Sequence, residues 1–136
     1  MIKKIERVHA APPPNVLIVD DVSANLELLA EILRARGLEP RPVLSGQQAI
    51  MAALADPPDL ILLDINMPGM NGWEFLYEYS RLDTDIKSGI IVVMLTTSDS
   101  PETKAKAMSW DSVSDYVTKP LTREIMESLN NKYFKY

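Results

Sequence analysis

Three short apolar runs that end abruptly in polar residues constrain the fold of this chain more than any other feature. The runs are residues 16–19, 60–63 and 90–95, and the polar residues that follow them are Asp20 and Asp21, Asp64, and Thr96. Apolar and polar residues do not alternate within the runs, which is typical of parallel strands buried on both faces. Because the carboxyl ends of parallel strands meet at one edge of a sheet, we expect these polar side chains to gather there.

Helical signals follow the strands along the chain. Leucines at helical spacing predict a helix over residues 24–36, with Ser23 as its N-cap and Gly37 as its stop. Ser45 and Gln48 have the spacing of a capping box and predict that a second helix begins there.

The second half of the chain continues the alternation. Asn71 caps a third predicted helix over residues 73–81, and residues 83–89 are expected to form a polar connection. Ser100-Pro101 is expected to start a fourth helix, with proline in its favoured first position. Thr122 is the expected cap of a last helix.

Two weaker strands complete the predicted sheet. Residues 41–44 are interrupted by proline, which cannot donate a ladder hydrogen bond, so this strand is placed at an edge. Residues 116–118 form the last strand and lead into Lys119-Pro120. Five strands alternating with five helices indicate the α/β class, with one five-stranded doubly wound parallel sheet covered by helices on both faces.

The domain is predicted to begin near Asn15. Residues 1–14 end in a proline triplet and are expected to form a flexible tail, and residues 15–136 are expected to form one domain. The chain carries a net charge of −5, which argues against nucleic acid as its main partner, and it has no cysteine, which excludes disulfides and thiolate catalysis. No apolar stretch approaches the ~20 residues of a membrane span, so a soluble cytoplasmic protein is expected.

The three aspartates predict a metal site. Clustered carboxylates repel one another, and a hard divalent cation with oxygen ligands, such as Mg²⁺, removes that conflict. The alternative for Asp20 and Asp21 alone is that they cap the following helix, but Asp64 ends a strand expected to lie close by.

A site that only binds a metal needs neither a hydroxyl nor an ammonium group. A phosphoryl group in transfer has oxygens that can accept hydrogen bonds from both. Asp64 is therefore a candidate nucleophile, with Thr96 and Lys119 as contacts for the phosphoryl oxygens. Thr97 is adjacent, and the sequence does not decide which threonine faces the site.

The ordered set Asp20, Asp21, Asp64, Thr96 and Lys119 resembles the receiver domain of bacterial two-component response regulators. The segment from residue 64 to residue 72, DINMPGMNG, is similar to the phosphorylation loop of that family. The resemblance covers residues 15–130 and implies a flavodoxin-like (βα)5 fold with strand order 2-1-3-4-5.

The resemblance also implies roles for individual residues. Asp64 would accept a phosphoryl group from a phosphohistidine on a histidine kinase or phosphotransfer protein. Asp21 and Asp64 would bind Mg²⁺ or Mn²⁺ directly, Asp20 would do so through water, and Asn66 through its backbone carbonyl.

The remaining roles concern the response to phosphorylation. Thr96 matches the switch hydroxyl, Lys119 the phosphoryl-binding lysine, and Tyr116 the aromatic that turns inward on activation. For Tyr116, an ordinary half-buried strand aromatic is an equal alternative. Trp110 departs from the glycine-containing turn that the family often has; packing in the core or a binding surface would explain it.

The family resemblance implies a signalling module rather than an enzyme. We expect no output domain, so an unidentified protein would detect the switch. The module would be a monomer or a phosphorylation-linked homodimer. Three alternatives stay open: a haloacid-dehalogenase-like phosphatase with Asp64 as its nucleophile, a flavin- or ligand-binding module on the same fold, and a binding scaffold that is not phosphorylated. The phosphatase chemistry usually has a second aspartate at the position that Asn66 occupies here.

Overall fold

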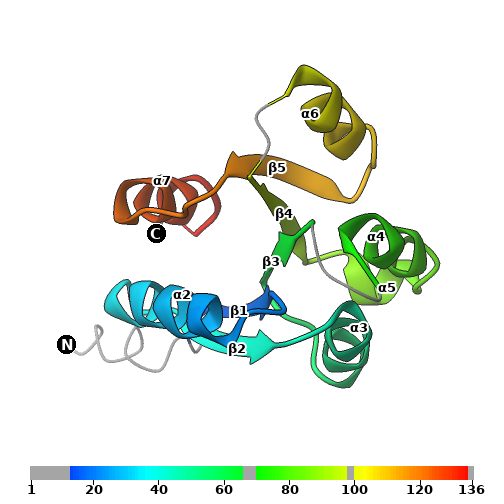
Figure 1. The fold of residues 1–136 in the computed structure, drawn as a ribbon. Helices are drawn as coiled ribbons and strands as arrows, with labels where there is room; N and C mark the ends of the chain where they lie inside the picture. The colour runs from blue at the N-terminus through cyan, green and yellow to red at the C-terminus, as the bar shows by residue number, and fades with distance from the viewer. Residues whose placement is uncertain (1–12, 66–69, 98–99, 135–136) are drawn as a thin grey trace.

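Five parallel strands form a single sheet in this computed structural model, which describes residues 13–65, 70–97 and 100–134. The strand order is β2-β1-β3-β4-β5, as predicted (Figure 1). The strands are β1 (Asn15–Val19), β2 (Glu39–Val43), β3 (Leu60–Asp64), β4 (Ile91–Thr96) and β5 (Val113–Thr118). The expected tail falls almost entirely outside the described residues.

Helices cover both faces of this sheet. They are α2 (Ser23–Ala35), α3 (Gly46–Ala55), α4 (Gly72–Ser80), α5 (Thr84–Lys87), α6 (Pro101–Met108) and α7 (Arg123–Tyr133). α2 and α7 lie on one face, and the other helices lie on the opposite face (Figure 1). The predicted doubly wound α/β architecture is therefore confirmed.

The two faces of the sheet bury separate hydrophobic clusters. Successive residues of a strand point to opposite faces, so Ile18 and Leu62 pack under α2 and α7, whereas Leu17 and Leu63 pack under α3 and α4. The central strands are almost fully buried, which explains why their sequences are continuous apolar runs.

Most of the predicted helix caps are present. Asn71 forms a full capping box with Glu74 at the start of α4, and Ser100 and Thr122 accept backbone hydrogen bonds at the starts of α6 and α7. Gly37 has a φ of +78°, the left-handed conformation expected of a helix stop. Ser45 accepts from the backbone N–H of Gln48, as predicted.

Two local predictions were wrong. The N-cap of α2 is Val22 rather than Ser23, and it makes no side-chain cap because valine has no hydrogen-bonding group. The carboxylate of Asp20 accepts the backbone N–H of Val22 at 2.9 Å. Residues 84–87 form the short helix α5 within the expected polar connection. Four residues are too few for a periodic pattern to reveal a helix.

Strand limits also differ from those predicted. β2 begins at Glu39, two residues earlier than expected, but it lies at the sheet edge, where its prolines are tolerated. β5 begins at Val113, and a register irregularity occurs where it joins β4.

The start of α4 approaches the end of β3 closely. The backbone N–H of Gly72 donates to the carbonyl of Ile65 at 2.8 Å. A Cβ atom on Gly72 would lie 2.7 Å from the Cα of Ile65, so a side chain at this position would force the backbone apart. Glycine therefore fixes the helix against the residue that follows Asp64.

Candidate functional site

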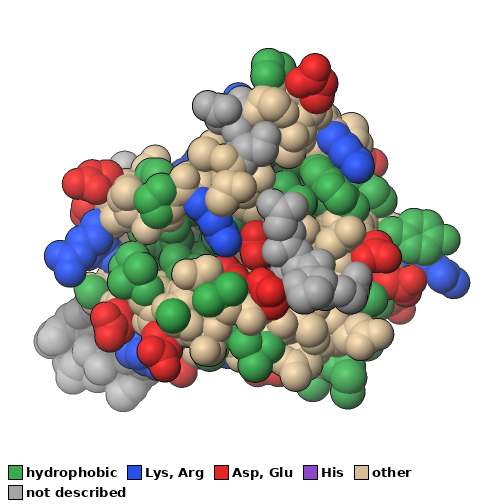
Figure 2. Space-filling model, viewed as in Figure 1, with side chains coloured by type: hydrophobic (Ala, Val, Ile, Leu, Met, Phe, Trp, Pro, Cys, Tyr) green, Lys and Arg blue, Asp and Glu red, His purple; other side chains and the backbone are tan. Residues whose placement is uncertain are grey.

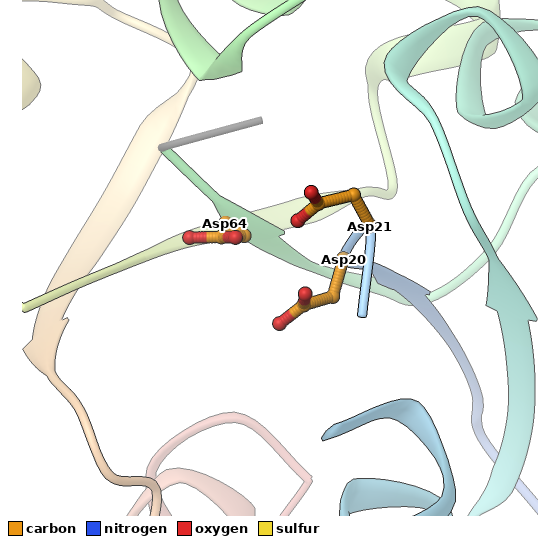
Figure 3. Close-up of side chains that lie close together, drawn as sticks. All are labelled: Asp20, Asp21 and Asp64. Carbon is orange, nitrogen blue, oxygen red and sulfur yellow. The ribbon is translucent and has the colours of Figure 1, made fainter. Parts of the chain in front are cut away.

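Three aspartates meet at the carboxyl edge of the sheet, as predicted. β1 and β3 are neighbours, with Val19 paired to Leu63, so Asp20 and Asp64 follow at the same level. Carboxylate oxygens of Asp20, Asp21 and Asp64 lie within 4.8 Å of one another (Figure 3). Asp20 and Asp64 are 1% and 4% exposed, whereas Asp21 is exposed to solvent.

The carboxylate of Asp20 is held by the beginning of α2. One oxygen accepts the backbone N–H of Val22 at 2.9 Å, and the other accepts the side-chain amide of Asn25 at 3.3 Å. These bonds offset part of the cost of burying a charge.

Lys119, the residue after β5, forms ion pairs with both Asp20 and Asp64. Its ammonium lies 3.2 Å from a carboxylate oxygen of Asp20 and 3.3 Å from one of Asp64. Its backbone N–H donates to the carbonyl of Thr96 at 2.6 Å, which fixes the end of β5 to the end of β4. The structure thus brings together residues that are far apart in the sequence.

The two threonines occupy different surroundings. Thr96 is 1% exposed. Thr97 is exposed and lines a cavity of about 290 Å³ between α2 and the segment after β5, together with Asp20 and Lys119. Tyr116 is half-buried and packs against the cluster under α3, α4 and α6. Asn66 lies outside the described residues.

The donor set fits a hard divalent cation. Three carboxylates and one ammonium leave a formal excess of two negative charges at this edge. Carboxylate oxygens are the ligands that Mg²⁺ and Mn²⁺ prefer. The charge and the ligand chemistry therefore agree with the predicted metal.

A second polar cluster lies beside Tyr116. Asp115 accepts hydrogen bonds from Lys132 at 3.0 Å and from the hydroxyl of Tyr133 at 3.3 Å, which joins α7 to β5. Burial acts to raise the pKa of Asp115, but the hydrogen bonds from Lys132 and from the backbone of Tyr116 outweigh it and lower the pKa below 3.8. The hydrogen bond to Asp115 raises the pKa of Lys132, and burial raises that of Tyr133.

Sequence reasoning missed Asn25 as a contact of Asp20. A polar residue in the first turn of a helix that directly follows a functional strand end is the signal that points to it. The first turn of such a helix returns over the strand end, so its side chains reach the site.

Comparisons with known proteins show the family to which the chain belongs. The family model described as response regulator receiver domain matches residues 16–130. The response regulator PleD of Caulobacter vibrioides is 35% identical over 106 residues, which is 78% of this chain but 23% of PleD. The sensor histidine kinase GacS of Pseudomonas protegens is 28% identical over 86% of this chain, which spans 13% of GacS.

Solved structures show the same architecture. A two-component response regulator from Cytophaga hutchinsonii has a TM-score of 0.79 and 35% identity, with 91% of this chain and 99% of that chain covered. The chemotaxis protein CheY4 of Vibrio cholerae has a TM-score of 0.79 and 28% identity, with 89% and 98% covered.

None of the helices in the described part of the chain combines the length and apolar character that a membrane crossing needs. The predicted architecture, the cluster at the sheet edge and the family match lead to one conclusion. The chain belongs to the response regulator receiver domain family and is a phosphoacceptor signalling module of two-component systems.

Proposed function

We propose that Asp64 is the residue that accepts the phosphoryl group. The observation that carries this proposal is the position of the Lys119 ammonium, 3.3 Å from Asp64 and 3.2 Å from Asp20. The buried carboxylate of Asp64 is placed to react with a phosphoryl group, and the Lys119 ammonium beside it is placed to offset the negative charge of that group.

In the transfer step, a carboxylate oxygen of Asp64 attacks the phosphorus of a phosphohistidine on a partner protein. A P–O bond forms as the P–N bond breaks, and the electron pair of the broken bond stays on the imidazole nitrogen of the donor. Lys119 contacts an oxygen of the transferred group and offsets its added negative charge. A bound Mg²⁺ would neutralise further charge on the phosphoryl oxygens.

We propose that Asp21 and Asp64 bind this cation directly and that Asp20 holds it through water. The support is that the Asp20 carboxylate already accepts hydrogen bonds from Val22 and Asn25, whereas Asp21 faces solvent. The backbone carbonyl of Asn66 is a further proposed ligand, in a part of the chain that the structure does not describe.

Thr96 is the proposed switch hydroxyl, with Tyr116 as the aromatic that responds. Met94 is paired with Tyr116 across β4 and β5, and both belong to the cluster under α3, α4 and α6. Because side chains alternate along a strand, Thr96 shares this face with Met94, whereas Thr97 lies on the face of the cavity. A charge-assisted hydrogen bond of about 1.5–3 kcal/mol between Thr96 and the phosphoryl group would shift the population of the switched state about tenfold or more.

We further propose that residues 15–136 act as a cytoplasmic receiver domain preceded by the tail of residues 1–14. A histidine kinase or phosphotransfer protein would be its donor, and a separate protein its target. The domain would assist its own phosphorylation and dephosphorylation without being an enzyme. The family match favours this function over the phosphatase and scaffold hypotheses.

The test is incubation with Mg²⁺ and a small-molecule phosphodonor, followed by intact-mass measurement. We expect one phosphate on the wild type and none on Asp64→Asn. Asp111→Asn, which removes an exposed carboxylate after α6, should label like the wild type. Equal labelling of Asp64→Asn would contradict the proposal.

The switch assignment has its own matched pair of variants. Thr96→Ala should abolish the change in Tyr116 that phosphorylation causes, measured by NMR of the tyrosine ring, and Thr97→Ala should retain it. The opposite result would assign the switch to Thr97.

A further inference from the structure

An aromatic groove lies on the face of the molecule covered by α3, α4 and α6. It has a volume of about 650 Å³, and the residues that line it are Gln47, Met70, Trp73, Glu74, Tyr77, Glu78 and Trp110. Figure 2 shows hydrophobic side chains between α6 and α4, with acidic side chains beside them. The two tryptophans of the chain both line this groove. Asp20, Asp21 and Asp64 do not line it, so the groove is a surface separate from the candidate functional site.

The aromatic side chains of the groove are anchored yet accessible. Trp73 and Trp110 pack against the hydrophobic core and remain partly exposed, and Tyr77 is 55% exposed. Tryptophan and tyrosine contribute most to protein interfaces when their rings are held rigidly beside a pocket. Trp110 therefore serves both roles that the sequence left open, core packing and an accessible surface.

The charge of the groove is complementary to a cation. Among the described residues that line it, Glu74 and Glu78 are carboxylates, one turn apart on α4, and no lining side chain is cationic. The rings already accept cations from neighbouring positions. The Lys106 ammonium lies 4.4 Å from the ring centroid of Trp73, and the Arg81 guanidinium lies 5.8 Å from that of Tyr77.

We propose that this groove docks a partner protein through a segment that carries lysine or arginine beside a large apolar side chain. The apolar side chain packs between the tryptophan rings, and the cation pairs with Glu74 and Glu78. The aromatic walls supply buried contact area, and the two carboxylates select a basic segment over an acidic one. Docking does not require phosphorylation of Asp64.

The intrinsic fluorescence of the two tryptophans gives a direct test on the full chain without a phosphodonor. The probe is a short amphipathic peptide of leucine and lysine, and its counterpart carries glutamate in place of each lysine. We expect the lysine peptide to shift tryptophan emission in a saturable manner and the glutamate peptide to leave it unchanged. Equal responses to both peptides, or no response to either, would overturn the proposal.

Charge-neutral variants test the role of the carboxylates. Glu74→Gln combined with Glu78→Gln should weaken binding of the lysine peptide about fivefold, the effect expected for two exposed ion pairs. Glutamine at position 74 preserves the capping box of α4. The matched control is Glu27→Gln with Glu31→Gln, which removes two carboxylates one turn apart on α2 and should leave affinity unchanged. If both double variants weaken binding equally, the effect comes from the net charge of the protein, and the docking site is refuted.

Two further outcomes would show that something other than a partner protein occupies the groove. If a chain without residues 1–12 binds the peptide more tightly and has a different emission spectrum, the basic N-terminal segment occupies the groove. If emission changes with protein concentration in the absence of peptide, a second copy of the chain occupies it. Either result would contradict docking of a separate protein.

Discussion

Replacing Lys119 with methionine should destabilise the metal-free protein, and added Mg²⁺ should recover part of the loss. The substitution keeps most of the length and apolar character of the side chain but removes the ammonium that contacts two buried carboxylates. Asp20 and Asp64 would then repel each other with no cation between them.

The distances from the Lys119 ammonium to the two carboxylates give the size of the expected loss in unfolding free energy. At an effective dielectric constant of 20, unit charges 3.2 and 3.3 Å apart attract by about 5 kcal/mol each. Desolvation offsets much of this attraction, and removing one partner of a buried ion pair typically costs about 3–5 kcal/mol. Because 20% of the Lys119 side chain is exposed, we expect the lower end, about 3 kcal/mol.

The assay is urea unfolding followed by circular dichroism, with EDTA or with saturating Mg²⁺. A ligand at ten times its Kd stabilises the folded state by about 1.4 kcal/mol. The variant should gain more than the wild type does, because the ammonium no longer competes with the cation for Asp20 and Asp64. We expect the difference in unfolding free energy to shrink by about 1 kcal/mol or more on adding Mg²⁺.

Lys104→Met provides the control, since Lys104 is exposed on α6. It should change the unfolding free energy by less than about 0.5 kcal/mol with or without Mg²⁺. The reasoning fails if Lys119→Met costs less than about 1 kcal/mol in EDTA, or if Mg²⁺ leaves the difference unchanged.

Three further substitutions test the surrounding structure. Asp115→Asn should reduce the unfolding free energy by about 0.5 kcal/mol at neutral pH. Because the pKa of Asp115 is lowered in the folded state, its stabilising contribution is present above pH 3.8 and is lost as the pH falls through the lower folded-state pKa. The unfolding free energies of wild type and variant should therefore converge in acid. Gly72→Ala should cost about 2 kcal/mol by thermal unfolding, because its Cβ would meet the backbone of Ile65, and full stability would contradict the close approach. Ser45→Ala should cost about 1 kcal/mol through loss of the α3 cap and leave labelling by a phosphodonor at the wild-type level.

Several parts of the fold followed from local sequence patterns. The caps at Asn71, Ser100 and Thr122 and the stop at Gly37 were predictable because each depends on residues within one helical turn. The wrong N-cap at Ser23 has the opposite cause. Asp20, a residue of the site, accepts the backbone N–H of Val22, and α2 begins one residue earlier than the local pattern indicates.

The sequence by itself determined the parallel sheet and the edge at which Asp20, Asp64 and Lys119 meet. Continuous apolar runs require burial on both faces, and parallel strands place their ends together. Only the tertiary structure decided that Lys119 reaches both carboxylates, that Asn25 holds Asp20, and that the two tryptophans line one groove. These contacts depend on how each helix packs against the sheet and on side-chain rotamers, which no periodic pattern in the sequence encodes.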